Sequence, residues 1–322
     1  MPRKSRSKKV IYAAMAGNCL VAVTKFAAAF WTGGSAMLAE GVHSLVDTGN
    51  QGLLLYGLHR AELRPNSERP LGYGRELYFW SFIVALLIFS LGAGVAVFEG
   101  IMHVLTPRAI EDAYVNYIVL ALAFVFEGST WLIALRGIDE LKGSEGYVEA
   151  FRRSKDPPSF MVLFEDSAAL VGIALAAAGT WAATAYQMPI LDGLASILIG
   201  LVLAATAAIL ATETKSLLIG EPAHPEVVQS ITRLALADSA ILKVNGVITV
   251  HLAPDQIMAA LSLEFEDSLT TSAIEAKVVD LEERIRAAHP DIINLFIKPQ
   301  TPGRFKEARQ QRFASDVPTA GE

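Results

Sequence analysis

The sequence predicts an integral membrane protein in two parts, an all-α bundle of six transmembrane helices and a small α+β domain that follows it. Hydrophobic residues make up 52% of the 322 residues, and the mean hydropathy is positive. Charged residues are 19% of the chain and gather between long apolar runs, which is typical of a protein that crosses a membrane several times. The last third differs, because it mixes short apolar patterns with charged residues as a soluble domain does.

Six apolar runs define the expected transmembrane domain. Each is long enough for the roughly 20 residues that a bilayer requires, and they cover residues 10–31, 35–58, 77–104, 113–136, 160–184 and 190–212. The first run is too long for a cleaved signal sequence, so we expect it to be retained as a span. The expected segments are a basic N-terminus (1–9), the six-span domain (10–212), the α+β domain (213–300) and a disordered tail (301–322).

Basic residues gather in the loops on one side of the six expected spans. They precede span one, follow span two and follow span four, at Arg3, Lys4, Arg6, Lys8, Lys9, Arg60, Arg64, Arg69, Arg75, Arg136, Lys142, Arg152, Arg153 and Lys155. The opposite loops contain only Arg108. The positive-inside bias therefore predicts a multi-pass protein with both termini in the cytoplasm, and we expect it in a bacterial inner membrane.

The segment after span six has the periodicities of a small α+β domain. Apolar residues at helical spacing begin at Pro225, and strand-like runs follow at 242–252 and 257–265. A second helical stripe covers 268–288, and a last strand covers 292–297. The order α-β-β-α-β predicts a ferredoxin-like cytoplasmic sheet with helices on one face.

Polar residues interrupt the second apolar run at Glu40–Gln51, which reads EGVHSLVDTGNQ. His43 and Asp47 are four residues apart, so a helix places both on one face. An imidazole and a carboxylate in that arrangement are half of a tetrahedral metal site. Ionisable groups at membrane depth are costly and usually mark a path for ions or protons. The alternative is that both side chains only hydrogen-bond neighbouring helices.

Other expected spans also contain ionisable residues. Glu165 and Asp166 are adjacent in span five, while Lys25 and Glu127 lie in spans one and four. Because Lys25 and Glu127 have opposite charges, we favour a structural ion pair between them over a role in transport.

Composition argues against several functional classes. The net charge of -6 gives no reason to expect a nucleic-acid partner. Cys19 is the single cysteine, so the chain has no intramolecular disulfide and no thiolate cluster. The sequence shows no nucleophile with a positioned base, no phosphate loop and no cofactor fingerprint, so we expect no enzyme activity and no permanently bound cofactor.

Three motifs together point to a family. They are TGGSAMLAEGVHSLVDTGNQ in span two, RPLGYGRELYFWS at the start of span three and LFEDSAALVG in span five. With six spans and an α-β-β-α-β domain, the chain resembles the cation diffusion facilitator family of divalent metal transporters, and is most similar to its mitochondrial zinc-transporter branch. The resemblance covers about residues 10–300. It implies a homodimer in which each protomer exports a divalent cation, typically Zn²⁺, in exchange for protons by alternating access.

The resemblance also implies the ligands of a transport site. The family uses a pair from span two, matched by His43 and Asp47, and a pair from span five, whose aspartate is matched by Asp166. The family's histidine four residues earlier is Val162 here, which cannot bind a metal. Two arrangements stay open. We favour three protein ligands plus water, and the alternative recruits Glu165, which lies about 100° round the helix from Asp166; for Glu165 a structural role is an equal alternative.

One imidazole and two carboxylates suit Zn²⁺ and also admit Mn²⁺, Fe²⁺, Co²⁺ or Cd²⁺. Metal binding requires a neutral His43 and ionised Asp47 and Asp166, so metal displaces protons and protons displace metal. A different hypothesis is a membrane metal sensor or scaffold that binds metal without transporting it. Metal uptake by proteoliposomes under a pH gradient separates the two.

We expect no other metal site of this family. The residues at the family's positions for a loop site and for bridging histidines in the α+β domain are Asn66, Arg69, Tyr73, Ile248, Ser262 and Ile297. The histidines present near that domain are His224, His251 and His289. Lone histidines on soluble elements are usually solvated or hydrogen-bonded, and we expect that role for all three.

Overall fold

The computed structural model describes residues 3–32, 35–107, 113–142, 146–147, 150–151 and 155–313. Within these ranges some side chains, including those of Lys25 and His43, lie outside the description. The chain divides into two compact units, Met1–Leu218 and Ile219–Glu322. The first unit is helical, and the second contains the sheet.

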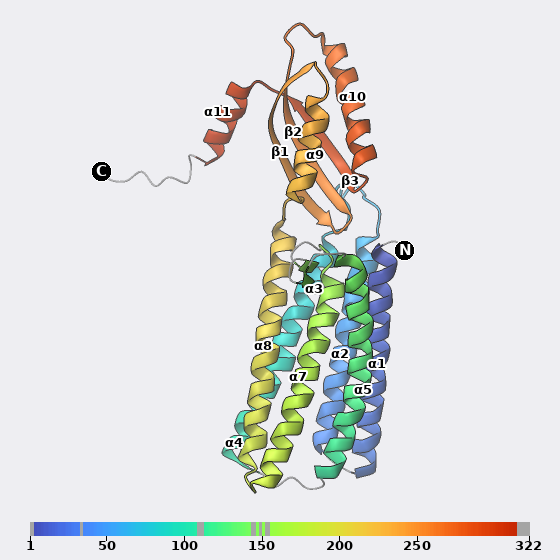
Figure 1. Cartoon of the computed structure of the whole chain (residues 1–322), viewed down its shortest axis with the longest axis vertical. Helices are drawn as coiled ribbons and strands as arrows, with labels where there is room; N and C mark the ends of the chain where they lie inside the picture. The colour runs from blue at the N-terminus through green and yellow to red at the C-terminus, as the bar shows by residue number, and fades with distance from the viewer. Residues whose placement is uncertain are drawn as a thin grey trace, which may run out of the picture. The chain divides into compact units, whose positions relative to one another are not determined.

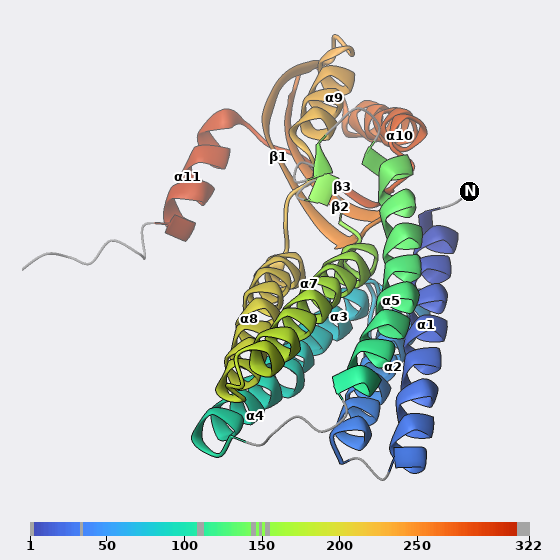
Figure 2. The same ribbon diagram turned by 60° about the horizontal axis from the view of Figure 1, so that its bottom comes forward.

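The helices of the first unit run side by side as long rods (Figure 1 and Figure 2). They are α1 (Arg3–Thr32), α2 (Ser35–Ala61), α3 (Glu76–Leu87), η1 (Ile88–Ala93), α4 (Gly94–Leu105), α5 (Ala113–Lys142), α7 (Pro157–Ala185) and α8 (Ile190–Ile219). Among the described residues, four helices are long and apolar enough to cross a membrane: Glu76–Leu105, Asn116–Asp139, Pro157–Ala185 and Ile190–Ile219. The multi-pass membrane prediction is therefore supported, and the count of six spans stays a prediction.

A π-helical segment, η1, joins α3 to α4 within one continuous helix. Ser90 lies in this segment, and its hydroxyl donates a 2.9 Å hydrogen bond to the carbonyl of Leu86. Beyond η1, α4 packs closely on α8. A Cβ at Gly100 would lie 2.8 Å from the carbonyl oxygen of Gly193, so only glycine permits this approach. Small residues at helix crossings are how membrane helices gain packing contacts.

An ion pair ties α2 to α3 where the connecting loop begins and ends. The Arg60 guanidinium donates two hydrogen bonds to the Glu76 carboxylate, at 2.9 and 2.8 Å. Arg60 and Arg69 both lie over the Tyr73 ring, with the guanidinium carbons 5.0 and 5.2 Å from the ring centroid. The Asn66 amide donates to the Tyr73 hydroxyl at 2.9 Å. The residues expected to lack metal in this loop therefore contact one another.

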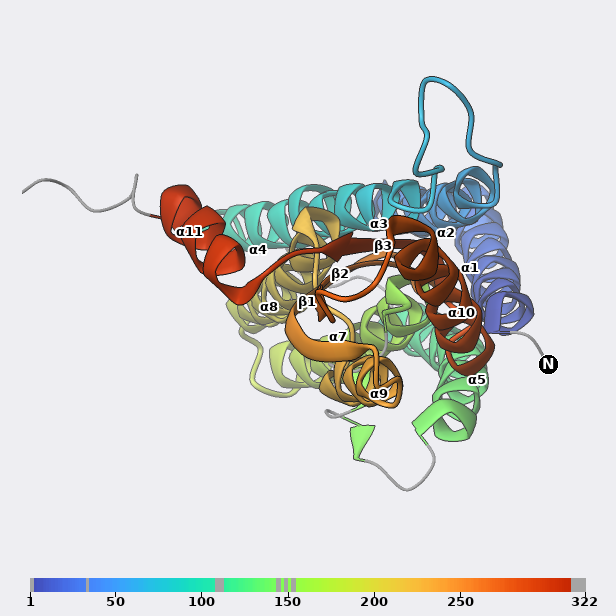
Figure 3. The same ribbon diagram turned by 90° about the horizontal axis from the view of Figure 1, so that it is seen from above.

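The second unit contains a three-stranded sheet with helices. Its elements are α9 (Pro225–Leu236), β1 (Ile241–Ala253), β2 (Gln256–Phe265), α10 (Thr271–Ala288), β3 (Ile292–Pro299) and α11 (Pro302–Phe313). The strands lie in the order β1-β2-β3 (Figure 3), with β1 and β2 antiparallel and β2 and β3 parallel. The predicted order α-β-β-α-β agrees with these elements. A ferredoxin-like assignment stays a prediction.

Alternation along β2 builds the core of the second unit. Every second residue of this strand is buried, and the set is Ile257, Ala259, Leu261, Leu263 and Phe265. These side chains form one cluster with Ile231 of α9 and Leu281 of α10, so both helices cover the same face of the sheet. The Thr270 side chain accepts a hydrogen bond from the Ala273 amide and caps the start of α10. The opposite face of the sheet is not covered by α9 or α10.

The C-terminal segment differs from the expectation of disorder from residue 301. Residues Pro302–Phe313 form the helix α11. Its Phe305 ring packs on β1 at Gly246, where a Cβ would come within 2.6 Å of the ring. Because Gly246 has no side chain, the Phe305 ring of α11 can occupy that space. The composition of the segment does not reveal this contact.

Candidate metal transport site

Helix α2 carries both residues predicted as ligands from span two. Asp47 is half-buried, and its carboxylate lies close enough to Glu165 and Asp166 of α7 to act on both electrostatically. His43 lies one helical turn before Asp47, and its side chain falls outside the description. Helix periodicity places the two residues on one face, so a role for His43 stays a prediction.

Helix α7 places two adjacent carboxylates inside the apolar bundle. Glu165 is 9% exposed and Asp166 is 1% exposed. One oxygen of each, Oε1 of Glu165 and Oδ2 of Asp166, is buried without a hydrogen-bond partner. A buried carboxylate oxygen without a partner is destabilising, so it marks a place where a cation, a proton or water would bind favourably. Val162, one turn before Asp166, is fully buried.

A hydrogen-bonded chain of amides connects α1, α2 and α7 at Glu165. The Asn18 side chain donates to Oε1 of Gln51 at 3.1 Å. The Gln51 side chain in turn donates from Nε2 to Oε2 of Glu165 at 3.3 Å. All three residues are buried. We call Asn18, Gln51 and Glu165 the amide relay.

Helix α5 brings a further acid to the same region. Glu127 acts electrostatically on both Glu165 and Asp166. Trp131 lies one turn further along α5 and donates from its indole nitrogen to the Ser167 hydroxyl of α7 at 2.9 Å. This bond fixes the register of α5 against α7. The side chain of Lys25, the expected partner of Glu127, lies outside the description.

Three helices therefore contribute acidic side chains of one sign to a poorly hydrated region. Asp47, Glu127, Glu165 and Asp166 repel one another there, and a divalent cation would relieve that repulsion. Among the described side chains, no three His, Cys, Asp or Glu residues lie close enough together to hold a metal ion. A set that includes His43 falls outside that statement.

The sequence-based prediction missed Gln51 and Asn18 as parts of this site. A signal was present, because Gln51 follows Asp47 by four residues and therefore shares its helix face. Asn18 is a polar residue in an otherwise apolar run. The sequence alone could not show that these two amides contact each other.

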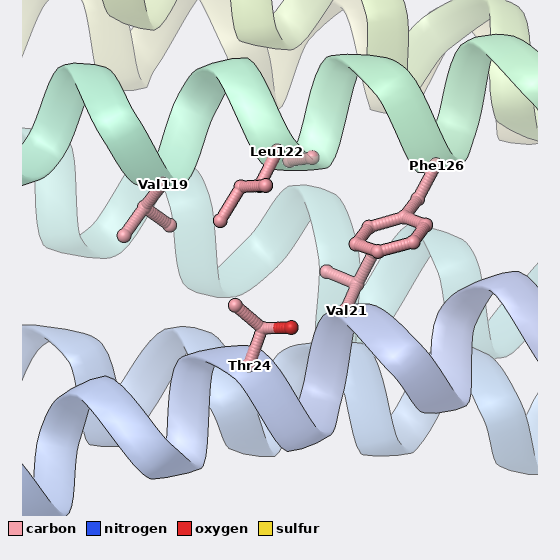
Figure 4. A pocket seen from close by; sticks show the side chains of 6 residues that line it. Val21, Thr24, Val119, Leu122 and Phe126 are labelled. Carbon is pink, nitrogen blue, oxygen red and sulfur yellow. The ribbon is translucent and has the colours of Figure 1, made fainter.

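Apolar side chains of α1 and α5 line a small hollow between these helices (Figure 4). Its lining residues are Val21, Thr24, Val119, Leu122, Ala123 and Phe126. None of them is ionisable, so this hollow has no ligands for a cation.

The histidines of the second unit have ordinary hydrogen-bond partners. The His224 ring accepts a hydrogen bond from the Glu226 amide and caps α9. His251 Nδ1 lies 3.3 Å from the carbonyl of Ala253, and His289 Nε2 lies 2.8 Å from the Ser230 hydroxyl. Each of the three imidazole rings therefore has a contact with a protein group in its own unit.

Comparison with known proteins connects the acidic helices to a family. Residues 11–219 match the model of the cation efflux transmembrane domain. The chain belongs to the cation efflux family. This match runs from within α1 to the end of α8, so all residues of the candidate site fall within it.

Relatives of this cation efflux protein share its sequence over most of its length. The "Proton-coupled zinc antiporter SLC30A9, mitochondrial" of Mus musculus is 32% identical over 82% of this chain and 47% of its own length. The Homo sapiens protein of the same name is 30% identical over 90% of this chain and 52% of its own. "Metal tolerance protein C4" of Arabidopsis thaliana is 32% identical over 73% of this chain and 52% of its own. The chain thus spans about half the length of these curated relatives.

These comparisons also correct one prediction. The two antiporters are mitochondrial proteins by name. That finding contradicts the expected bacterial inner membrane, and the prediction is wrong. It rested on the bias of basic residues between loops, and this bias reports the sidedness of a membrane rather than which membrane it is.

The close approach of α1 to α5 next to the acidic side chains gives a first testable prediction. A Cβ at Gly17 would lie 2.6 Å from Cγ2 of Thr130, so Gly17→Ala should lower the free energy of unfolding by about 1–3 kcal/mol through overpacking. Adding Thr130→Ser removes the clashing methyl group and should restore stability. Thermal unfolding in detergent measures both.

Gly128→Ala is the matched control, because a Cβ at Gly128 meets nothing within 4 Å. Equal destabilisation by Gly17→Ala and Gly128→Ala would contradict the close approach of the two helices.

Proposed function

We propose that this protein exports a divalent metal cation, Zn²⁺, in exchange for protons, as a homodimer that works by alternating access through a six-helix bundle. Membership of the cation efflux family supports the transport of a cation. The names of the two antiporters support zinc and proton coupling. The metal is the cargo, and no permanently bound cofactor forms part of the proposal.

The observation that carries this proposal is the pair of acids inside α7. Asp166 is almost completely buried in a helix apolar enough to span a membrane, and its Oδ2 has no hydrogen-bond partner. Keeping such a group for packing alone is unfavourable, since an apolar side chain of similar size would be more stable there. The proposed ligands are His43, Asp47 and Asp166, with water in the fourth position and Glu165 as a nearby carboxylate.

Proton coupling follows from the chemistry of the same ligands. A metal binds neutral imidazole and ionised carboxylate, so metal entry releases protons from His43, Asp47 or Asp166. Protonation from the other side of the membrane then expels the metal. Imidazole changes its charge near physiological pH, which makes His43 the natural coupling group.

A second candidate is efflux of Mn²⁺, Fe²⁺, Co²⁺ or Cd²⁺ by the same mechanism. Val162 occupies the position where the family has a histidine, and the acids around it provide only oxygen ligands. A site with one imidazole selects zinc less strongly than a site with two. A sensor or scaffold that binds metal without moving it is the remaining alternative.

Removing a ligand tests the transport site directly. Asp47→Ala and Asp166→Ala should each reduce proton-driven Zn²⁺ uptake by proteoliposomes to the level of protein-free liposomes, because each removes a charged ligand. The control is Thr214→Val, since the buried Thr214 hydroxyl donates to backbone carbonyls of its own helix. Parental transport by both alanine variants would make the site assignment wrong and favour the sensor or scaffold.

Restoring the family's missing histidine tests the metal preference. Val162→His adds an imidazole one turn from Asp166, so the ratio of Zn²⁺ to Mn²⁺ uptake should rise by about 10-fold or more, since imidazole suits zinc better than manganese. A competition panel of divalent metals on proteoliposomes measures the ratio. An unchanged ratio with intact transport would place residue 162 outside the coordination shell.

The proposed homodimer rests on the face of the sheet that α9 and α10 leave uncovered. Ile248 of β1 pairs with Ala260 of β2, which in turn pairs with Phe296 of β3, so the three side chains form a row across that face. Ile248 is 63% exposed and Phe296 is 58% exposed. An exposed apolar row on a regular surface suits contact with an identical copy.

Charge on that row should weaken the dimer. Ile248→Lys combined with Phe296→Lys should shift the protein toward monomers in mild detergent, as measured by mass photometry, because lysine is unfavourable in the core of an interface. Val279→Lys on α10 is the control, since Val279 is also exposed but lies outside the row. A parental chain that is monomeric at all concentrations would refute the dimer itself.

A further inference from the structure

The amide relay has a fixed direction. Gln51 is completely buried, and its carbonyl oxygen accepts from Asn18. The Gln51 amide nitrogen must therefore face the other way, toward Oε2 of Glu165. A flipped Gln51 would place two acceptor oxygens together at Glu165 and two donor groups together at Asn18, and both contacts are unfavourable. Asn18 on α1 thus sets the orientation of a donor on α2 that holds a carboxylate on α7.

The relay engages one oxygen of Glu165, and the Asn50 side chain also acts on this carboxylate as a hydrogen-bond partner. Oε2 receives the Gln51 hydrogen bond, while Oε1 is buried and lacks a hydrogen-bond partner. At 3.3 Å the bond lies just beyond the usual N–H···O range, so it orients the carboxylate without satisfying it. Glu165 therefore presents one unsatisfied acceptor beside Asp166.

A water molecule bound to the metal would need such an acceptor. With Val162 in place of a histidine, the proposed site has three protein ligands and water. A metal-bound water is a strong hydrogen-bond donor, and acceptors that hold it in place contribute to metal affinity.

We propose that Gln51, oriented by Asn18, is a positioning residue that holds Glu165 so that Oε1 accepts a hydrogen bond from the water completing the metal's coordination. This inference rests on the proposed transport of a divalent cation and adds how the chain compensates for its missing histidine. It assigns no metal contact to Gln51. The role of Gln51 passes entirely through Glu165, and that dependence is what an experiment can measure.

The first experiment changes the donor at position 51. Gln51→Leu and Gln51→Glu should each raise the KM for Zn²⁺ uptake into proteoliposomes by about 10-fold, the lower end of the effect of losing a supporting hydrogen bond, with little change in maximal rate. Gln51→Glu keeps the size of the side chain and an acceptor for Asn18 but lacks the amide donor. Zn²⁺ binding to the detergent-solubilised protein, measured by calorimetry, should weaken by the same factor. Thr214→Val again serves as the control.

A double-mutant cycle separates positioning from packing. In a Glu165→Leu background the carboxylate is absent, so adding Gln51→Leu should change the KM by less than about 2-fold, as expected when one residue acts only through the other. Asn18→Leu should raise the KM in the parental chain and have no further effect after Gln51→Leu. If a leucine double variant does not fold, the single variants Gln51→Glu and Asn18→Leu decide the question by KM and calorimetry alone.

The outcomes are distinguishable from failure of the proposed function. If the parental protein takes up no Zn²⁺, or Asp47→Ala transports as well as the parent, the proposed function fails. If Asp47→Ala is inactive while Gln51→Leu and Gln51→Glu keep the parental KM, only the positioning role is wrong. Equal losses from Gln51→Leu with and without Glu165 would also overturn the role and make Gln51 a packing residue.

Discussion

The cost of removing a carboxylate from water is the constraint on which the helical unit depends. Without compensation, burial of one ionised carboxylate costs several kcal/mol. Helix α7 buries two in succession, Glu165 and Asp166. The surrounding helices supply partial compensation through the Gln51 amide on Glu165 and through the Thr130 side chain, which hydrogen-bonds Asp166. The compensation is incomplete, because Oε1 of Glu165 and Oδ2 of Asp166 are buried without a hydrogen-bond partner.

Comparison with Glu76 shows that this deficit is specific. Glu76 is also an acid at a helix crossing, but the Arg60 guanidinium satisfies both of its oxygens, and the Trp80 indole adds a 3.4 Å contact. A carboxylate paired in this way has no remaining need for a metal. The two kinds of acid are similar in sequence, since each lies at or inside an apolar run. Glu76 has an arginine partner and joins α2 to α3. Glu165 and Asp166 each keep one oxygen without a partner among the described residues and are therefore candidate ligands.

Much of the fold follows from sequence periodicity, as does the expectation that His43 and Asp47 share one helix face. Long apolar runs predict the helices, and alternation from Ile257 to Phe265 predicts a half-buried strand, because both patterns repeat along one element. The contact between Gln51 and Glu165 joins positions 114 residues apart, and no local pattern contains it. Helix α11 was not predicted for the same reason. Its Phe305 packs against Gly246 of β1, and this contact exists only in the folded domain. Spacing on one helix is readable from sequence, and partners on different helices are not.

The π-helical turn at Ile88–Ala93 influences which side of the following helix, α4, faces its neighbours. Such a turn contains one residue more than regular α-helix needs, and one residue corresponds to about 100° of rotation. After this turn, Gly100 of α4 lies against Gly193 of α8, and Val97 lies against Gly200. A one-residue deletion in η1 would leave the span long enough for the bilayer and yet turn Gly100 away from α8. The length and the hydropathy of the span would hardly change. The segment η1 therefore determines which side of α4 faces α8, and a comparison of whole spans by length and hydropathy would not detect that.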